Sequence, residues 1–180
     1  MFKAILLALV AVVVSVSAGI WWLAQRALPI TDGVITLKQL SHSAVVQFDE
    51  RGVSYVEAAN DRDLWLVQGY ITASERMFQM DMLRRSALGE LSQVVGAGCL
   101  PHDRLMRTIG INRLSQEEAK NLSAEVRANL EAYSMGVNSY ITEKRGQMPL
   151  EFVLFGYEPR LWRAGDTIAI LKQRQYELDE

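Results

Sequence analysis

The period of the apolar positions changes near residue 63 and divides the chain into a β-like part and a longer helical part. Before the change, three short segments rich in β-branched or alternating apolar residues predict strands: 34–40, 44–48 and 53–58. The residues Asp-Glu-Arg-Gly separate the last two segments, and Gly52 can adopt the positive φ that such a turn often needs. We therefore predict a β-hairpin over residues 44–58.

From Asp63 onward, the apolar residues recur every three or four positions, which is the period of an α-helix. The Asp63 carboxylate can cap the first turn by accepting a free backbone N–H. Gly89 can kink or end this helix. Its core-facing stripe is predicted to consist of Leu66, Tyr70, Ala73, Met77, Met80, Arg84, Ala87, Leu91 and Val94. Arg84 is the one charged residue on that stripe, so it needs a partner if it is buried.

Further helical segments follow the long helix. Residues 103–113 predict one or two turns, and Ser115 with Glu118 fits a capping box that starts another helix. Ser123 starts the next helix, and Gly136 inside it predicts close packing against a neighbouring element. The apolar stripe of this helix is Val126, Leu130, Tyr133, Val137 and Tyr140.

A last helix is predicted to begin with Asp166 as its cap and to run to the final residue, because no Gly, Asn or Pro ends it. Glu177, Asp179 and Glu180 would be unfavourable at a helix C-terminus, where the helix dipole favours positive charge. We therefore expect the polypeptide to continue beyond residue 180.

The N-terminus predicts a separate element, because residues 4–24 are apolar and uncharged. Roughly 20 such residues suffice to cross a bilayer as a helix, and Trp21 and Trp22 suit its interface. The small residues at 16–18 also fit a signal-peptide cleavage site. Residues 1–26 are therefore interpreted as a signal anchor or a signal peptide, and either one would export the rest of the chain.

Composition narrows the class of protein. The hydrophobic fraction is 49% and the charged fraction 22%, which is globular composition, and the net charge of −2 argues against a nucleic-acid binder. Cys99 is the only cysteine, so the 180 residues hold no internal disulfide. His42 and His102 are isolated in the sequence, and no Cys/His cluster has the spacing of a zinc site.

The residues by themselves form no catalytic constellation. The serines lie in no nucleophile elbow such as G-x-S-x-G, and no glycine loop is placed to hold phosphate. Glu117 and Glu118 are adjacent, so they would point about 100° apart on a helix and are interpreted as first-turn charges. No catalytic residue and no metal ligand is assigned from the sequence.

The charges on the long helix allow three interpretations. Asp81 and Arg85 are four residues apart with the acid first, which favours a helical ion pair. Arg84 lies on the apolar stripe, so the preferred interpretation is a buried or half-buried ion-pair network that fixes the packing of this helix. The alternatives are substrate contact by Arg84 or Arg85, and a solvated charged face.

The ordered set of motifs along the chain resembles the penicillin acylase (penicillin amidase) family of N-terminal nucleophile hydrolases. Ser54 departs from the family pattern, which usually has Pro after the hairpin Gly-Val pair. The motifs that carry the resemblance are Asp49 to Ala58, Asp63-Leu64, Gly69-Tyr70, Ala73, Arg76, Gln79-Met80-Asp81, Arg84-Arg85, Gly89, Leu91, Gly96, Asp103, Arg107, Gly136-Val137-Asn138, Pro149, Glu151-Phe152, Gly156-Tyr157, Pro159, Trp162 and Asp166.

The resemblance implies an α+β fold: residues 27–180 would be the mostly helical, incomplete α-chain part of an αββα hydrolase, with the hairpin joining its sheets. Such a precursor cleaves itself into an α chain and a β chain. The β chain begins with the nucleophilic serine and holds the oxyanion-hole donors. The catalytic groups would therefore lie outside this chain, and some partners of the helix charges would lie there too.

The resemblance also implies a substrate class and partners. The whole enzyme would hydrolyse the carbon–nitrogen bond of a linear amide, either an N-acyl compound or a β-lactam such as a penicillin. The expected partners are the β-chain region, that substrate and a membrane, with no nucleic acid, and the protein would face the periplasm or the exterior. Substrate-binding residues remain unknown, although Gln175 and Tyr176 fall near the family's acyl pocket. A calcium-binding glutamate of several members would lie just past Glu180.

One alternative from a different class remains open at this stage. The chain could be a truncated, catalytically inactive, membrane-anchored helical protein with an interaction role. That alternative predicts a stable soluble domain from residue 27 onward. The hypothesis that the chain is an incomplete part of an acylase predicts that residues 27–180 alone expose apolar helix faces and aggregate or stay molten.

Overall fold

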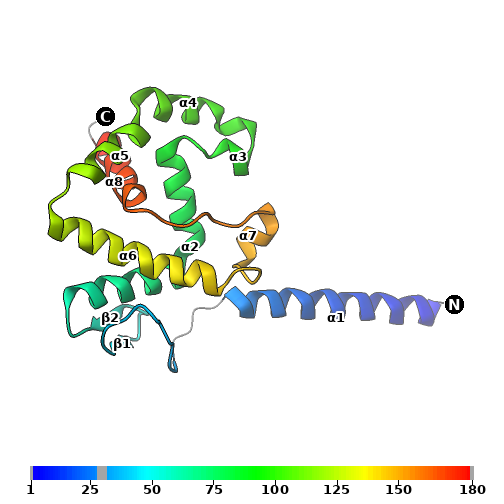
Figure 1. The fold of residues 1–180 in the computed structure, drawn as a ribbon. Coiled ribbons are helices and arrows are strands. Elements are labelled where there is room, and N and C mark those ends of the chain that lie inside the picture. The colour runs from blue at the N-terminus through cyan, green and yellow to red at the C-terminus, as the bar shows by residue number, and fades with distance from the viewer. Residues whose placement is uncertain (1, 28–31, 179–180) are drawn as a thin grey trace.

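The computed structural model describes residues 2–27 and 32–178, and helices dominate them (Figure 1). Figure 1 shows the long helices α2 and α6 crossing at the centre, with α8 beside α5 and the small sheet at one end. The elements are α1 (Phe2–Ala27), β1 (Val45–Phe48), β2 (Ser54–Glu57), α2 (Asp61–Leu88), α3 (Ser92–Val95), the 3₁₀ turn η1 (Ala97–Cys99), α4 (Leu100–Ile109), α5 (Ile111–Asn121), α6 (Ala124–Glu143), α7 (Leu150–Phe155) and α8 (Ala164–Leu178).

The predicted β-hairpin is confirmed. Strands β1 and β2 pair antiparallel, with Val45 opposite Glu57. The carboxylate of Asp49 accepts the backbone N–H of residues 51 and 53 at 2.9 and 2.8 Å, which closes the turn. Gly52 has φ 77°, the positive value that its position predicted.

The strand predicted for residues 34–40 is wrong. The segment is irregular and ends in a turn in which Leu40 N–H donates to Leu37 O at 3.2 Å. A strand needs a ladder partner for its backbone groups, and among the described residues this segment has none. Ile35, Leu37 and Leu40 instead pack on the main core cluster, whereas Val34 is exposed.

Helix α2 follows the predicted stripe, but its start is corrected. Asn60 caps it, because its side chain accepts the N–H of Asp63 at 2.8 Å. The predicted cap, Asp63, lies inside the first turn with its side chain buried. Gly89, with φ 67°, ends the helix in the left-handed conformation. The stripe is therefore buried only as far as Ala87.

A kink interrupts α2 at Arg76, whose φ of −147° and ψ of 33° are not helical. Just before it, Thr72 Oγ1 donates to Gln68 O at 2.7 Å and Ser74 Oγ donates to Ile71 O at 2.8 Å. Hydroxyls that bond the preceding turn in this way bend helices.

The shorter helices correct two predicted boundaries. Gly110, with φ 81°, divides the region around residues 103–113 between α4 and α5. Ser115 is no cap: it is buried inside α5 and donates to Asn112 O at 2.9 Å. Glu117 and Glu118 therefore do not lie in a first turn. The start of α6 is as predicted, since Ser123 Oγ accepts the N–H of residue 126 at 3.3 Å.

Helix α8 begins at Ala164, two residues before the predicted cap. Asp166 still takes part in its start, because Oδ2 accepts the N–H of Arg163 at 2.9 Å. The helix is described as far as Leu178, so the prediction that it runs to residue 180 lies outside the described residues.

The core forms where α2 and α6 cross at two glycines. A Cβ added to Gly136 would overlap the backbone oxygen of Leu66, and one added to Gly69 would overlap that of Tyr133. Only glycine allows so close an approach, which confirms the prediction for Gly136. The main buried cluster around this crossing is Val67, Tyr70, Ile71, Ala73, Met77, Met80, Val137, Tyr140, Ile141, Met148, Phe152 and Trp162.

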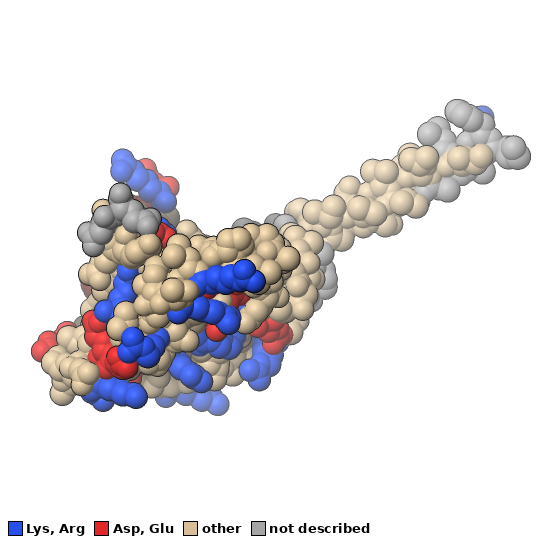
Figure 2. Space-filling view, turned by 90° about the horizontal axis from the view of Figure 1, so that it is seen from above, with Lys and Arg blue, Asp and Glu red and all other residues tan. Residues whose placement is uncertain are grey.

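Helix α1 lies at the N-terminus and projects away from the helical body in Figure 1. Figure 2 shows its middle as a stretch without charged side chains, whereas Lys and Arg lie among Asp and Glu on the body. In the part of the chain that the structure describes, no helix combines the length and the hydropathy that a membrane span requires. The membrane anchor predicted for residues 1–26 is thus not supported, and the side chain of Trp22 lies outside the described residues.

Candidate functional site

A buried ion-pair network joins α2 to the start of α8. Arg84 is only 1% exposed, and its guanidinium bonds the carboxylate of Asp81 one turn earlier. It lies 3.5 Å from Asp166 Oδ2 and donates to the backbone oxygens of residues 160 and 161 at 3.1 and 3.4 Å. Burial lowers the pKa of Arg84, and the two carboxylates oppose that effect. The preferred interpretation, a buried ion-pair network, is confirmed.

Both carboxylates of this network have further partners. Asp81 Oδ2 accepts Arg85 Nε and the Tyr157 hydroxyl, each at 2.8 Å, and the Arg85 guanidinium stacks over the Tyr157 ring at 4.8 Å. Arg160 donates to both oxygens of Asp166 at 2.8 Å. Burial and the charge of Asp81 raise the pKa of Tyr157.

The charges of this network have partners inside the chain. Asp81, Arg84 and Arg85 all bond groups of the described residues. A guanidinium that is 1% exposed also has no surface to present to a substrate. The network therefore positions helices and does no chemistry by itself.

Two more buried carboxylates tie loops to helices. Asp63 accepts the backbone N–H groups of Ser41 and His42 at 3.0 Å each. The Ser41 bond contributes most to lowering the pKa of Asp63, to about 2. Asp103 accepts the N–H groups of Leu91 and Ser92 at 3.0 and 2.8 Å. Burial alone would raise the pKa of Asp103, but these bonds outweigh it, so the pKa is lowered.

A serine–histidine contact links α2 to α4 and gives His102, which the sequence placed in no metal-binding cluster, a partner on another helix. Ser86 Oγ lies 2.9 Å from His102 Nε2, and Gln173 of α8 donates to the same Oγ at 2.6 Å. His102 Nε2 also lies 3.2 Å from Ser86 O, which can only accept. The tautomer of His102 decides which of these atoms donates, so the distances show proximity and assign no proton. The contact is a link between helices, and only folding could reveal it.

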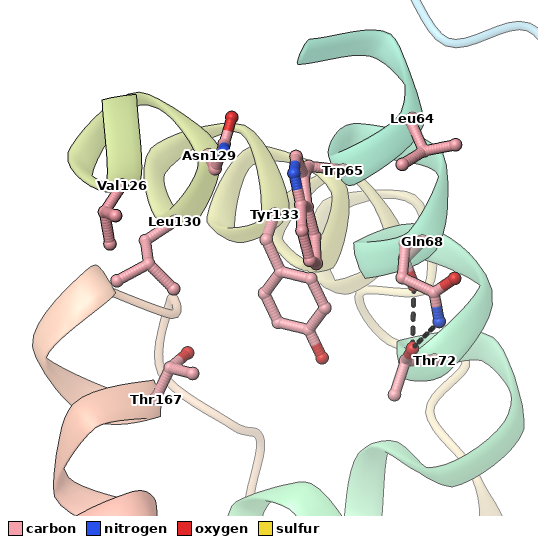
Figure 3. A pocket seen from close by; sticks show the side chains of 9 residues that line it. All are labelled: Leu64, Trp65, Gln68, Thr72, Val126, Asn129, Leu130, Tyr133 and Thr167. Carbon is pink, nitrogen blue, oxygen red and sulfur yellow. Dashed lines mark hydrogen bonds between the residues drawn. The ribbon is translucent and has the colours of Figure 1, made fainter. Parts of the chain in front are cut away.

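A groove between α2, α6 and α8 is a concave surface that could hold a partner or ligand (Figure 3). It has a volume of about 730 Å³. Figure 3 shows the Tyr133 ring pointing into the space between α2 and α8, below the Trp65 ring. The lining residues are Leu64, Trp65, Gln68, Thr72, Val126, Asn129, Leu130, Tyr133 and Thr167.

The groove is apolar with a few neutral polar groups, and no charged residue lines it. Gln68 donates to Thr72 Oγ1 at 3.2 Å along one wall (Figure 3). Burial raises the pKa of Tyr133, so its hydroxyl stays neutral at physiological pH. The side chain of Asn129 makes no hydrogen bond within the described residues. These groups can bind apolar surface and pair with neutral polar groups, but they cannot hydrolyse a bond.

The remaining sequence-based candidates lie apart from this groove. Gln175 is exposed on α8, while Tyr176 is half-buried against the second core cluster, and neither lines the groove. Cys99 is a free, half-exposed thiol. Among the described residues, no group of three or more His, Cys, Asp or Glu side chains is placed to hold a metal ion, so no ligand set is assigned.

Comparison with known proteins gives one family. The model of the penicillin amidase family matches residues 43–180. A solved structure of a thermostable penicillin G acylase from Alcaligenes faecalis superposes with a TM-score of 0.69 at 29% identity, covering 76% of this chain and 73% of that one. The mostly helical fold with its small sheet is therefore similar to that of a penicillin acylase.

The names of three curated relatives describe acylases. An acyl-homoserine lactone acylase QuiP from Pseudomonas fluorescens is 36% identical over 149 residues, 83% of this chain and 18% of the relative. The penicillin acylase 2 proenzyme of Pseudomonas sp. is 32% identical over 83% of this chain and 19% of its own length. Penicillin G acylase of Escherichia coli is 29% identical over 74% and 16%. The chain spans less than a fifth of the length of these three relatives.

Proposed function

The chain belongs to the penicillin amidase family, and we propose that it supplies the helical scaffold of an amidohydrolase whose reacting groups lie in a further region of the same polypeptide. The observation that carries this proposal is the match over residues 43–180, joined to the small share of each relative that the chain spans. In this proposal the chain is the α-chain part of an αββα fold.

The reaction proposed for the whole enzyme is hydrolysis of a linear carbon–nitrogen bond. A serine at the start of the further region would attack the amide carbonyl, and its free α-amine would act as the base. The resulting acyl-enzyme would then react with water. The amine leaves in the first step and the acid in the second.

The described residues support a scaffold role for this chain, with the reacting groups in the further region. The buried ionised side chains of α2 and the start of α8 bond one another, and the Ser86–His102 contact links α2 to α4. What the chain offers is rigidity, through the glycine crossing of α2 and α6 and the ion network that positions α8. A rigid scaffold keeps a substrate pocket in a fixed geometry.

The proposed substrates are N-acyl amides with an apolar acyl group. The relatives' names point to two classes, acyl-homoserine lactones and penicillins. We also propose export to the periplasm or the exterior through residues 1–26. Cell fractionation tests this proposal, and a purely cytoplasmic product would contradict export.

The test is amine release by the product of the complete reading frame. The purified protein is incubated with an acyl-homoserine lactone and with penicillin G, and the liberated primary amine is quantified by fluorescence. We expect release from at least one substrate and an N-terminal serine on a self-cleaved second chain. The 180-residue chain alone serves as the matched control and is expected to release none.

Two outcomes would contradict the proposal. One is a complete gene product that cleaves neither substrate class and yields no second chain. The other is a reading frame that ends at codon 180 and encodes a stable monomer, which would favour the non-enzymatic interaction protein.

A further inference from the structure

A concave surface with two arginines lies where α4 meets α5, and it shares no residue with the buried network or the groove. It has a volume of about 440 Å³. Gly110 ends α4 with φ 81° and precedes α5, so the chain changes direction there and each helix brings one arginine to the same space. The lining residues are Leu88, Glu90, Arg107, Gly110, Asn112 and Arg113.

This surface lies on a side of the molecule that is rich in positive charge. Figure 2 looks onto the side where α4 lies in Figure 1, and Lys and Arg side chains gather there. Within the lining, the two arginines outweigh the one carboxylate, that of Glu90. An anion therefore meets a favourable field as it approaches.

Arg107 is held in place with donors to spare. Its Nε donates to the backbone oxygen of Gly89 at 2.7 Å, which fixes the guanidinium beside the end of α2. The two Nη groups of Arg107 make no hydrogen bond or ion pair within the described residues. A guanidinium that is fixed by one bond and free at its other nitrogens is well prepared to bind an oxyanion through two parallel bonds.

Arg113 supplies a second guanidinium from the other helix. Its Nη2 would lie 3.9 Å from a Cβ added to Gly110, so this group lies close to the junction of the two helices. Arg113 pairs with Glu117 at 3.2 Å, but the two side chains are 69% and 54% exposed. An exposed ion pair contributes little to stability, so Arg113 can turn to an anion of higher charge.

The donors around the concave surface indicate the chemistry of the ligand. The side-chain amide of Asn112 also makes no hydrogen bond within the part of the chain that the structure describes, and it can donate. A phosphate group has enough oxygens to accept from both guanidinium groups and from this amide, and it carries up to two negative charges near neutral pH. We propose that the concave surface binds a phosphate group between Arg107 and Arg113, either as a free ion or as the headgroup of a phosphomonoester lipid. This binding goes beyond the proposed amide hydrolysis and does not depend on it.

Calorimetric titration of the complete gene product with inorganic phosphate, at low ionic strength, tests the binding. Arg113→Gln should weaken the affinity about tenfold, because a charge-assisted hydrogen bond is lost. The matched control is Arg104→Gln, since Arg104 is exposed on α4 and does not line the concave surface. It removes the same charge and should leave the affinity within about twofold. Thermal unfolding verifies that both variants fold, which is expected because both side chains are exposed.

Vesicles distinguish a lipid headgroup from a free ion. Phosphatidylcholine vesicles with added phosphatidic acid, which carries a phosphomonoester headgroup, are sedimented with the protein. Vesicles of phosphatidylcholine alone measure any retention through the apolar helix α1. Extra retention on phosphatidic acid that inorganic phosphate displaces, and that Arg113→Gln loses, supports the site with a lipid headgroup as its ligand. Calorimetric binding without such retention supports the site with a free phosphate ion.

Two results would overturn the proposal. One is the absence of saturable phosphate binding together with equal retention of wild type and Arg113→Gln on phosphatidic acid. The other is an equal loss of affinity in Arg104→Gln and Arg113→Gln, which would show general attraction between charges and no site. Neither result bears on amine release by the complete gene product, so a failure here and a failure of the proposed function are told apart.

Discussion

Arg84 illustrates how a single residue depends on partners distant in sequence. Its side chain is 1% exposed, and its guanidinium pairs with the carboxylate of Asp81 three residues away and with that of Asp166 82 residues away. A buried charge without its partner is strongly destabilising, whereas a fully paired one costs little. The residue therefore links the packing of α2 to that of α8.

Arg84→Met tests this link. The substitution leaves two buried carboxylates short of a partner, so the free energy of unfolding should fall by about 3–5 kcal/mol. Urea denaturation of the complete protein measures the loss. The control is Arg174→Met, since Arg174 is exposed and pairs with Glu177 alone among the described residues. It should cost less than about 1 kcal/mol, and an equally small loss for Arg84→Met would contradict a structural role for the network.

Asp63 gives a prediction on pH dependence. Its pKa is lowered from 3.8 to about 2 in the folded chain, so its ionised form stabilises the fold above pH 4. This stabilisation is lost as the pH falls from about 4 to 2. Asp63→Asn should therefore be less stable than the wild type at pH 7, with the difference shrinking towards pH 2.

Thermal unfolding at a series of pH values checks that prediction. Asp61→Asn is the control, because Asp61 is exposed in the same first turn and holds no loop among the residues that the structure describes. It should cost less at pH 7 than Asp63→Asn. A constant difference between wild type and Asp63→Asn from pH 7 to pH 2 would contradict the role of the ionised carboxylate.

At the scale of elements, the crossing of α2 and α6 organises the fold. Gly69 and Gly136 let the two backbones touch, and the main core cluster packs around that contact. The groove lies between the same two helices and α8, so its shape depends on the crossing. A change in the distance between α2 and α6 would alter the groove as well as the core.

Gly136→Ala should disrupt this crossing. The new methyl group would overlap the backbone oxygen of Leu66, so the helices must separate, at a cost of about 3 kcal/mol or more. Gly98→Ala is the control, because a Cβ there meets nothing within 4 Å. It should change the stability by no more than about 0.5 kcal/mol. Differential scanning calorimetry compares the two, and equal melting temperatures would contradict the close approach.

In the molecule as a whole, the buried charged side chains described above have partners, but the surface still exposes apolar side chains. Val95, Leu105, Leu154 and Leu171 lie open to solvent, in addition to those of the groove. A contiguous apolar surface marks an interaction site, and the groove lined by Trp65 and Val126 is such a surface. It agrees with a chain that spans less than a fifth of each of the three relatives compared.

Residues 27–180 produced alone should therefore not form a stable, independently folded domain. We expect them to bind the dye ANS and to aggregate or stay molten, because no partner covers their apolar faces. The complete gene product serves as the control and should bind little dye. A cooperative thermal transition of monomeric residues 27–180 would contradict this prediction and favour an independent interaction protein.

The sequence by itself determined the hairpin, the long stripe of α2, the start of α6 and the close approach at Gly136. These features depend on the spacing of apolar residues and on residues close to one another in the sequence, so they can be read from the sequence alone. It placed the caps of α2 and α5 wrongly, at Asp63 and Ser115, because a polar side chain near a helix start has several backbone groups within reach. The tertiary structure decided which one each side chain bonds.

Tertiary structure alone also decided the ion partners and the groove. Arg84 meets Asp166, and Ser86 meets Gln173, across more than 80 residues, and no local pattern encodes such pairs. The groove takes its walls from three helices whose stripes look like ordinary core faces in the sequence. Part of the predicted stripe of α6, Val126 and Leu130, lines this groove because no described element covers it.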